Sequence, residues 1–250
     1  MFDSADAYDR FMGRYSIPLA RVFAEFADTR AGQSVLEVGC GPGALTGELV
    51  RIVGDEAVSA VDPSPAFVTA ARERHPGVDV REAGAESLPF PDASFDSSLA
   101  QLVVHFMSDP VAGLSEMKRV TRPGGVVAAC VWDYTRDRNP LTIFWKAARR
   151  LDPSIETESK LAGTHEGDLA DLFAAADLHD IADGVLEVAV SHPDFDDWWQ
   201  PFTLGVGPAG RYVTSLSADQ RERLRSECVN EFPDGPFVIR AAAWAARARA

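Results

Sequence analysis

Two segments in the first half of the chain carry residues whose types and spacing fit a nucleotide site. Residues 35–43 read Val-Leu-Glu-Val-Gly-Cys-Gly-Pro-Gly, an apolar run that breaks into a turn with glycine at every second position. Glycine accepts a positive φ and lets a ligand approach the bare backbone. Asp62 ends a second apolar run about 20 residues later, where a carboxylate can accept hydrogen bonds from both ribose hydroxyls. The alternative for Asp62 is a helix N-cap before Pro63.

The acid in front of the turn, Glu37, helps to decide between nucleotide classes. Gly39, Gly41 and Ala44 also fit the G-x-G-x-x-G/A pattern of dinucleotide-binding folds. A carboxylate so close would repel a pyrophosphate, whereas it would attract a sulfonium with a free amino group. No tyrosine is followed four residues later by lysine, the pair that short-chain dehydrogenases use. The residues therefore favour S-adenosyl-L-methionine over a nicotinamide cofactor.

Composition argues against several classes of protein. The formal net charge is −14, from 38 acids against 24 Lys and Arg, so the clustered bases that nucleic-acid binding needs are not expected. The three cysteines are an odd number without a Cys-x-x-Cys pair, which predicts reduced thiols and no metal site. No signal peptide is recognised, and no apolar run approaches the roughly 20 residues that span a bilayer. We expect a cytoplasmic protein without a membrane or nucleic-acid partner.

Apolar periodicity predicts alternating strands and helices through the first half of the chain. Strands are expected over 34–38, 57–61, 78–81, 94–104 and 126–132, and helices over 44–53, 66–74 and 109–120. Strands that alternate with helices of about ten residues indicate a parallel sheet with right-handed crossovers.

The rhythm changes after residue 132. Helices are expected near 141–151 and 168–176, and strands over 181–190 and 237–246. Residues 192–235, rich in Trp, Phe, Gly and Pro, are interpreted as an insertion that forms a cap. We expect one domain over 1–250, with a helical lid over 1–30, a cofactor-binding core over 31–135 and a C-terminal half over 136–250.

Further motifs follow in the same order as in a known family. These are Glu86-Ser87-Leu88-Pro89-Phe90-Pro91-Asp92, Phe95-Asp96 and Arg122-Pro123-Gly124-Gly125. With them, residues 30–132 resemble the class I S-adenosylmethionine-dependent methyltransferases, in the small-molecule group that includes the ubiquinone and menaquinone C-methyltransferases. The resemblance implies a doubly wound α/β fold whose mostly parallel seven-stranded sheet has an antiparallel last strand. It also implies methyl transfer to a small-molecule acceptor by in-line displacement, with S-adenosyl-L-homocysteine as the product.

The resemblance also implies roles for individual residues at the cofactor. Gly39 and Gly41 would pass under the methionine moiety, and Glu37 would reach its ammonium. Asp62 would hold the ribose, and Gln101 would frame the methionine end. Around the adenine the resemblance places Pro63, Gly84, Ala85 and Glu86. The family often has Asp where this chain has Gly84, so the adenine would depend on backbone groups, on the Glu86 side chain or on water.

Several residues have both a functional and a structural interpretation. His105 is the candidate for a catalytic polar group near the transferred methyl, or it caps a helix or packs under Phe106. Arg14 binds the methionine carboxylate, or it is a surface arginine beside core aromatics. The aromatic residues after the fifth strand contact the acceptor or fill the core: Trp145, Trp198, Trp199 and Phe202. The remaining histidines are expected to face solvent: His75, His165, His179 and His192.

Two alternatives to methyl transfer follow from the same residues. One is a non-catalytic protein that binds S-adenosylmethionine, and the other is an NAD-dependent oxidoreductase.

Overall fold

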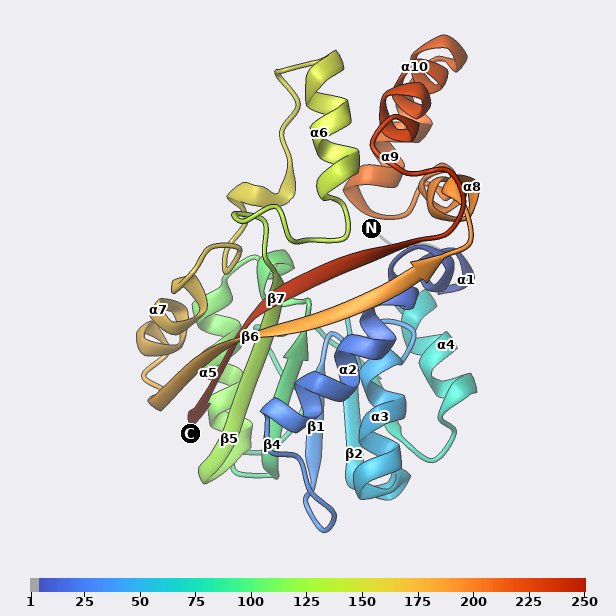
Figure 1. The fold of residues 1–250 in the computed structure, drawn as a ribbon. Helices are drawn as coiled ribbons and strands as arrows, with labels where there is room; N and C mark the ends of the chain where they lie inside the picture. The colour runs from blue at the N-terminus through green and yellow to red at the C-terminus, as the bar shows by residue number, and fades with distance from the viewer. Residues whose placement is uncertain (1–4) are drawn as a thin grey trace.

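The computed structural model describes residues 5–250 and is built around one seven-stranded sheet (Figure 1). The strand order is β3-β2-β1-β4-β5-β7-β6. Strands β1 to β5 pair in parallel, and β7 runs antiparallel to both β5 and β6. The predicted doubly wound α/β fold with an antiparallel last strand is confirmed. The strands are β1 (Val35–Val38), β2 (Val58–Asp62), β3 (Asp79–Glu82), β4 (Phe95–Gln101), β5 (Thr121–Trp132), β6 (His179–His192) and β7 (Phe237–Arg249).

Helices cover both faces of this sheet (Figure 1). One face packs against α2 (Arg14–Phe26), α3 (Ala44–Val53) and α4 (Pro65–Arg74), the other against α5 (Pro110–Val120) and α7 (Asp168–Ala175). A short helix α1 (Ala5–Tyr8) and one π-helical turn (Asp9–Gly13) precede α2. The strand order reverses between β1 and β4, and in open α/β sheets ligands bind at the carboxyl ends of the strands beside such a reversal.

A third apolar cluster, besides those on the two faces of the sheet, lies beyond the carboxyl ends of the strands (Figure 1). The segment between β6 and β7 folds into α8 (Phe195–Trp199), α9 (Gly207–Ser215) and α10 (Ala218–Val229), which pack with α6 (Thr142–Leu151). Phe144 of α6 stacks on Phe202 with ring centroids 4.5 Å apart. This cluster therefore forms a roof over the edge of the sheet where a ligand is expected.

Several predicted strand boundaries are wrong. β6 extends two residues beyond the predicted range at each end, and β7 continues to Arg249 instead of ending at 246. β4 ends at Gln101 instead of reaching residue 104, because Leu102 has a φ of +60° and turns the chain. β5 starts at Thr121 instead of 126. Its pairing with β4 shifts between Phe95 and Ser97, and this irregularity accommodates Pro123, which has no N–H to give to a regular ladder.

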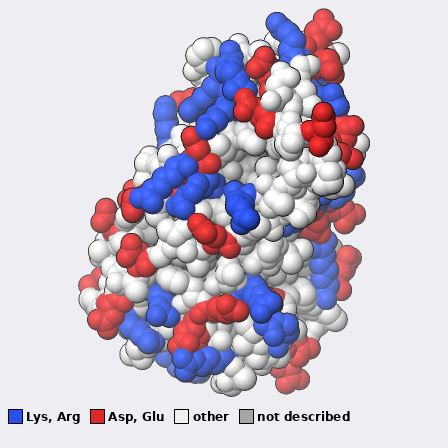
Figure 2. Space-filling view, in the orientation of Figure 1, with Lys and Arg blue, Asp and Glu red and all other residues white. Residues whose placement is uncertain are grey.

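The surface carries charges of both signs. On the face shown in Figure 2, Lys and Arg side chains are interspersed with Asp and Glu, a mixture typical of a solvated surface. Within residues 5–250, no helix is long and apolar enough to cross a membrane.

Candidate functional site

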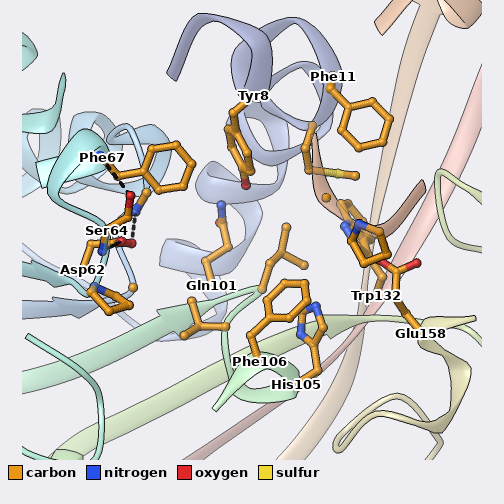
Figure 3. A pocket seen from close by; sticks show the side chains of 18 of the residues that line it. Tyr8, Phe11, Asp62, Ser64, Phe67, Gln101, His105, Phe106, Trp132 and Glu158 are labelled. Atoms are coloured by element: carbon orange, nitrogen blue, oxygen red, sulfur yellow. Dashed lines mark hydrogen bonds between the residues drawn. The ribbon is translucent and has the colours of Figure 1, made fainter. Parts of the chain in front are cut away.

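The turn after β1 and the acid at the end of β2 form one hydrogen-bonded unit. The backbone N–H groups of Gly41 and Ser64 donate to Oδ2 and Oδ1 of Asp62, both at 2.8 Å. The N-cap of α4 is Ser64, whose hydroxyl accepts from the N–H of Phe67 (Figure 3). The interpretation of Asp62 as that N-cap is therefore wrong. The carboxylate is instead fixed by two N–H donors at the rim of a cavity.

Gly39 shows why the turn requires glycine. Its φ is +74°, and a Cβ at this position would lie 2.4 Å from a methyl carbon of Val103. Any other residue would force the chain or Val103 to move. The bare backbone of Gly39 and of Gly41 faces the cavity.

The cavity has a volume of about 640 Å³ and lies at the carboxyl ends of β1, β2, β4 and β5 (Figure 3). This is within the range of about 300–1,000 Å³ typical of small-molecule sites. Six residues predicted from the sequence line it: Gly39, Gly41, Asp62, Pro63, Gln101 and His105. Much of the remaining lining is aromatic, including Tyr8, Phe11, Phe67, Phe106, Trp132 and Tyr134.

Three buried side chains in the lining each have a polar atom without a partner in the described part of the chain: Gln101, His105 and Trp132, whose indole Nε1 is unpaired. Gln101 donates from Nε2 to the carbonyl of Ser16 at 3.0 Å, but its Oε1 is not hydrogen-bonded. The Nδ1 of His105 is likewise unpaired. Burial lowers the pKa of His105 to about 3, so its ring is neutral at physiological pH. Such atoms are candidate ligand contacts, and His105 is a weak base.

Glu37 lies behind the glycine turn and outside the cavity lining. Its side chain is buried and accepts a hydrogen bond from the Thr46 hydroxyl at 2.5 Å. Burial, assisted by the negative charge of Asp62, raises the pKa of Glu37 to about 8. A positive charge in the cavity would favour the ionised carboxylate.

Residues 84–86, expected around the adenine, do not line the cavity. Glu86 accepts the backbone N–H groups of Ser108 at 2.8 Å and Asp109 at 3.3 Å, so its carboxylate organises the start of α5. Ala85 is buried in the core beneath that helix. A Cβ on Gly84 would lie 3.3 Å from the carboxylate of Glu86. The structure therefore does not bring Gly84, Ala85 and Glu86 together with Asp62 in the cavity.

Arg14 is turned away from the cavity toward the segment between β6 and β7. Its Nη1 lies 2.7 Å from Oδ2 of Asp197 and 2.9 Å from Nδ1 of His192. The Tyr15 hydroxyl lies 2.9 Å from Nε2 of the same histidine. His192 is 1% exposed, so the expectation that it faces solvent is wrong, because groups inside the protein engage both ring nitrogens. This geometry gives Arg14 a structural role that ties α2 to α8.

The aromatic residues after β5 fill the core of the roof. Four of them are buried in its apolar cluster, and none lines the cavity: Trp145, Trp198, Trp199 and Phe202. The segment between β6 and β7 instead reaches the cavity through Gly207 and Pro208.

A buried acid that the sequence does not reveal, Glu158, lies in the loop between α6 and α7. It lines the cavity and is 6% exposed. The indole Nε1–H of Trp145 donates to its Oε2 at 2.9 Å, and Tyr134 is a second hydrogen-bond donor. Burial raises the pKa of Glu158 to about 7. Tyr134 could have been found from its place just after β5, whereas nothing in the polar stretch 152–167 singles out Glu158.

Comparison with known proteins gives a match to a methyltransferase family and to relatives named as methyltransferases. The family described as a methyltransferase domain matches residues 36–129. The chain is 34% identical over 161 residues to phosphatidylethanolamine N-methyltransferase of Cereibacter sphaeroides. This match covers 62% of this chain and 77% of that protein. It is 32% identical over 153 residues to the ubiquinone/menaquinone biosynthesis C-methyltransferase of Hahella chejuensis, covering 56% and 61%.

A solved structure of geranyl diphosphate methyltransferase in complex with S-adenosylmethionine is similar in fold. Its TM-score is 0.56 at 15% identity, with 95% of this chain and 87% of that chain covered. The chain spans between 34% and 48% of the length of the first curated relatives that it matches. Because the Cereibacter relative is matched over most of its length, the comparison shows that this chain belongs to the class I S-adenosylmethionine-dependent methyltransferases.

Proposed function

We propose that this protein transfers a methyl group from S-adenosylmethionine to a small-molecule acceptor. The observation that carries the proposal is the Asp62 carboxylate, held by two N–H groups beside the bare glycine turn and at the wall of a 640 Å³ cavity. A cavity at the carboxyl ends of β1 and β2 is where an α/β sheet of this kind binds a nucleotide.

The residues present fit this cofactor. Asp62 would accept hydrogen bonds from the ribose hydroxyls, and Pro63 would pack against the adenine. Gly39 and Gly41 would allow close approach of the methionine part, and the unpaired Oε1 of Gln101 would accept from its ammonium. When bound, S-adenosylmethionine supplies a methyl group on a positively charged sulfur.

The chain contributes mainly by orientation and by exclusion of water. The aromatic and apolar lining leaves little water around the reacting atoms. Contacts with the protein hold cofactor and acceptor in the orientation that the reaction needs. His105 would act as a neutral hydrogen-bonding group, because its pKa of about 3 leaves it little strength as a base.

Calorimetric titration with S-adenosylhomocysteine tests the proposal. The wild type should bind this product and should not bind NADH. Asp62→Asn should weaken binding by about 10-fold to 100-fold, because hydrogen bonds to a charged acceptor are lost. Asp79→Asn, on the exposed start of β3, should bind as the wild type does. No binding to the wild type, or equal binding by both variants, would contradict the proposal.

A further inference from the structure

The cavity is longer than the cofactor end described above. Figure 3 shows Asp62 and Glu158 on opposite sides of it, with Gln101 between them. Asp62 ends β2 and Tyr134 follows β5, and β1 and β4 lie between these strands. Three strand spacings of about 4.8 Å separate the two ends by about 14 Å. If the proposed function is right, the cofactor occupies the β1–β2 end, and the β5 end is left for the acceptor.

The β5 end is mostly apolar, and its polar groups are the Glu158 carboxylate, the Tyr134 hydroxyl and the unpaired indole N–H of Trp132. Phe11, Trp132 and Leu141 belong to the cavity lining together with Tyr134 and Glu158. Across the whole lining, as far as residues 5–250 show it, the carboxylates are Asp62 and Glu158, and no Lys or Arg contributes. A negatively charged acceptor group would lose its hydration there without a lining cation to replace it, since Arg211, whose charge acts on Glu158, lies outside the lining.

Resting on the proposed function, we propose that Glu158 holds the nucleophilic atom of the acceptor and takes its proton. The acceptor is then an uncharged molecule with an apolar body and one O–H or N–H group that donates to Glu158. Acceptors with an O–H group and acceptors with an N–H group share the same requirement, a hydrogen-bond donor at the end of an apolar group.

The Glu158 side chain has a fixed orientation and a raised pKa, as a base that takes a proton from the acceptor requires. Trp145 on α6 and Tyr134 in the turn after β5 both donate to it, which fixes its orientation at the cavity wall. Burial raises its pKa to about 7, while the two donors and the positive charge of Arg211 on α9 act against that rise. A base with a pKa near the working pH is the most effective one.

The proton transfer balances. The O–H or N–H proton goes to Glu158, and the electron pair left on that atom forms the bond to the methyl carbon. The pair of the broken carbon–sulfur bond stays on sulfur, and the protonated Glu158 later returns its proton to solvent.

The test uses the wild type saturated with S-adenosylhomocysteine and three probes of one shape. These are naphthol, its methyl ether, which has no donor, and naphthoate, which is an anion. We expect naphthol to bind at least about tenfold more tightly than the other two. Its affinity should rise from about pH 6 to about pH 8 as Glu158 ionises, since the carboxylate is the better acceptor.

Two variants of the same loop form a matched pair. Glu158→Gln should reduce the affinity for naphthol by about tenfold or more and abolish its pH dependence, with binding of S-adenosylhomocysteine unchanged. Glu156→Gln, at an exposed position paired with Lys160, should leave the affinity for naphthol, its pH dependence and the binding of S-adenosylhomocysteine unchanged. Tyr134→Phe retains the acid but removes a donor to its ionised form, so the midpoint of the pH dependence should move upward.

The outcomes separate the two proposals. Equal affinity for naphthol and its ether, tighter binding of naphthoate, no binding of any probe, or an unaffected Glu158→Gln variant would overturn the role of Glu158. Failure of the wild type to bind S-adenosylhomocysteine would instead overturn the proposed function on which that role rests.

Discussion

Replacement of Glu37 by glutamine tests the electrostatics behind the glycine turn. Glu37 is 2% exposed, and burial raises its pKa from 4.5 to about 8. An acid whose pKa is raised by folding binds its proton more tightly in the folded state. Stability is therefore highest below pH 4.5 and falls as the pH rises toward 8. The interval from 4.5 to 8 corresponds to about 5 kcal/mol of unfolding free energy.

Glutamine removes this pH dependence and retains the shape of the side chain. Its amide oxygen can still accept from the Thr46 hydroxyl. The unfolding free energy of Glu37→Gln should be close to that of the wild type at about pH 5. By about pH 9 it should exceed that of the wild type by about 4 kcal/mol. Unfolding in urea at a series of pH values measures both free energies.

A second glutamate of the same region supplies the control. Glu48 lies on α3, and its hydrogen bond with Arg51 lowers its pKa. The carboxylate of Glu48 is ionised throughout the pH range tested, so Glu48→Gln should differ from the wild type by a constant amount. Parallel stability profiles for the wild type and Glu37→Gln would refute the reasoning, since they would mean that Glu37 ionises as easily as in the unfolded chain.

Three other substitutions test individual contacts. Arg14→Met should lower the unfolding free energy by about 1 kcal/mol, measured in urea, and leave S-adenosylhomocysteine affinity unchanged, because Arg14 ties α2 to α8; loss of affinity without loss of stability would contradict this. Gly39→Ala should cost about 2 kcal/mol or more in the same assay, since its Cβ would meet Val103 at a positive φ, and a neutral result would contradict the turn geometry. Trp145→Phe should raise the pKa of Glu158, which an upward shift in the pH profile of naphthol binding would reveal; an unshifted profile would speak against this hydrogen bond.

The glycine turn and Asp62 of the proposed cofactor end were predictable because these features are local, whereas Arg14, Glu37 and residues 84–86 do not line the cavity. Gly39 and Gly41 follow one apolar strand directly, and Asp62 ends the next. Pairing of the two neighbouring strands then brings the turn and the acid together, so their placement depends on no contact between distant segments. The family resemblance added the fold and the antiparallel last strand, which periodicity alone does not fix.

The β5 end of the cavity, where we propose that the acceptor binds, depends on contacts between segments far apart in the chain. Glu156 and Glu158 look alike in the sequence, but only Glu158 has the Trp145 indole and Tyr134 as donors, while Glu156 is exposed. His192 is buried for the same kind of reason, because Arg14 and Tyr15 approach it from the other end of the chain. Such partners are decided by tertiary packing, which no local pattern reports.

The central claim is that S-adenosylmethionine lies between the glycine turn and Asp62, with its sulfur directed toward the β5 end of the cavity. A crystal structure with S-adenosylhomocysteine bound tests this most directly. We predict that both ribose hydroxyls lie about 2.5–3.0 Å from the Asp62 carboxylate and that the sulfur faces the side of Glu158. A ribose placed away from Asp62, or a product bound outside this cavity, would contradict the account.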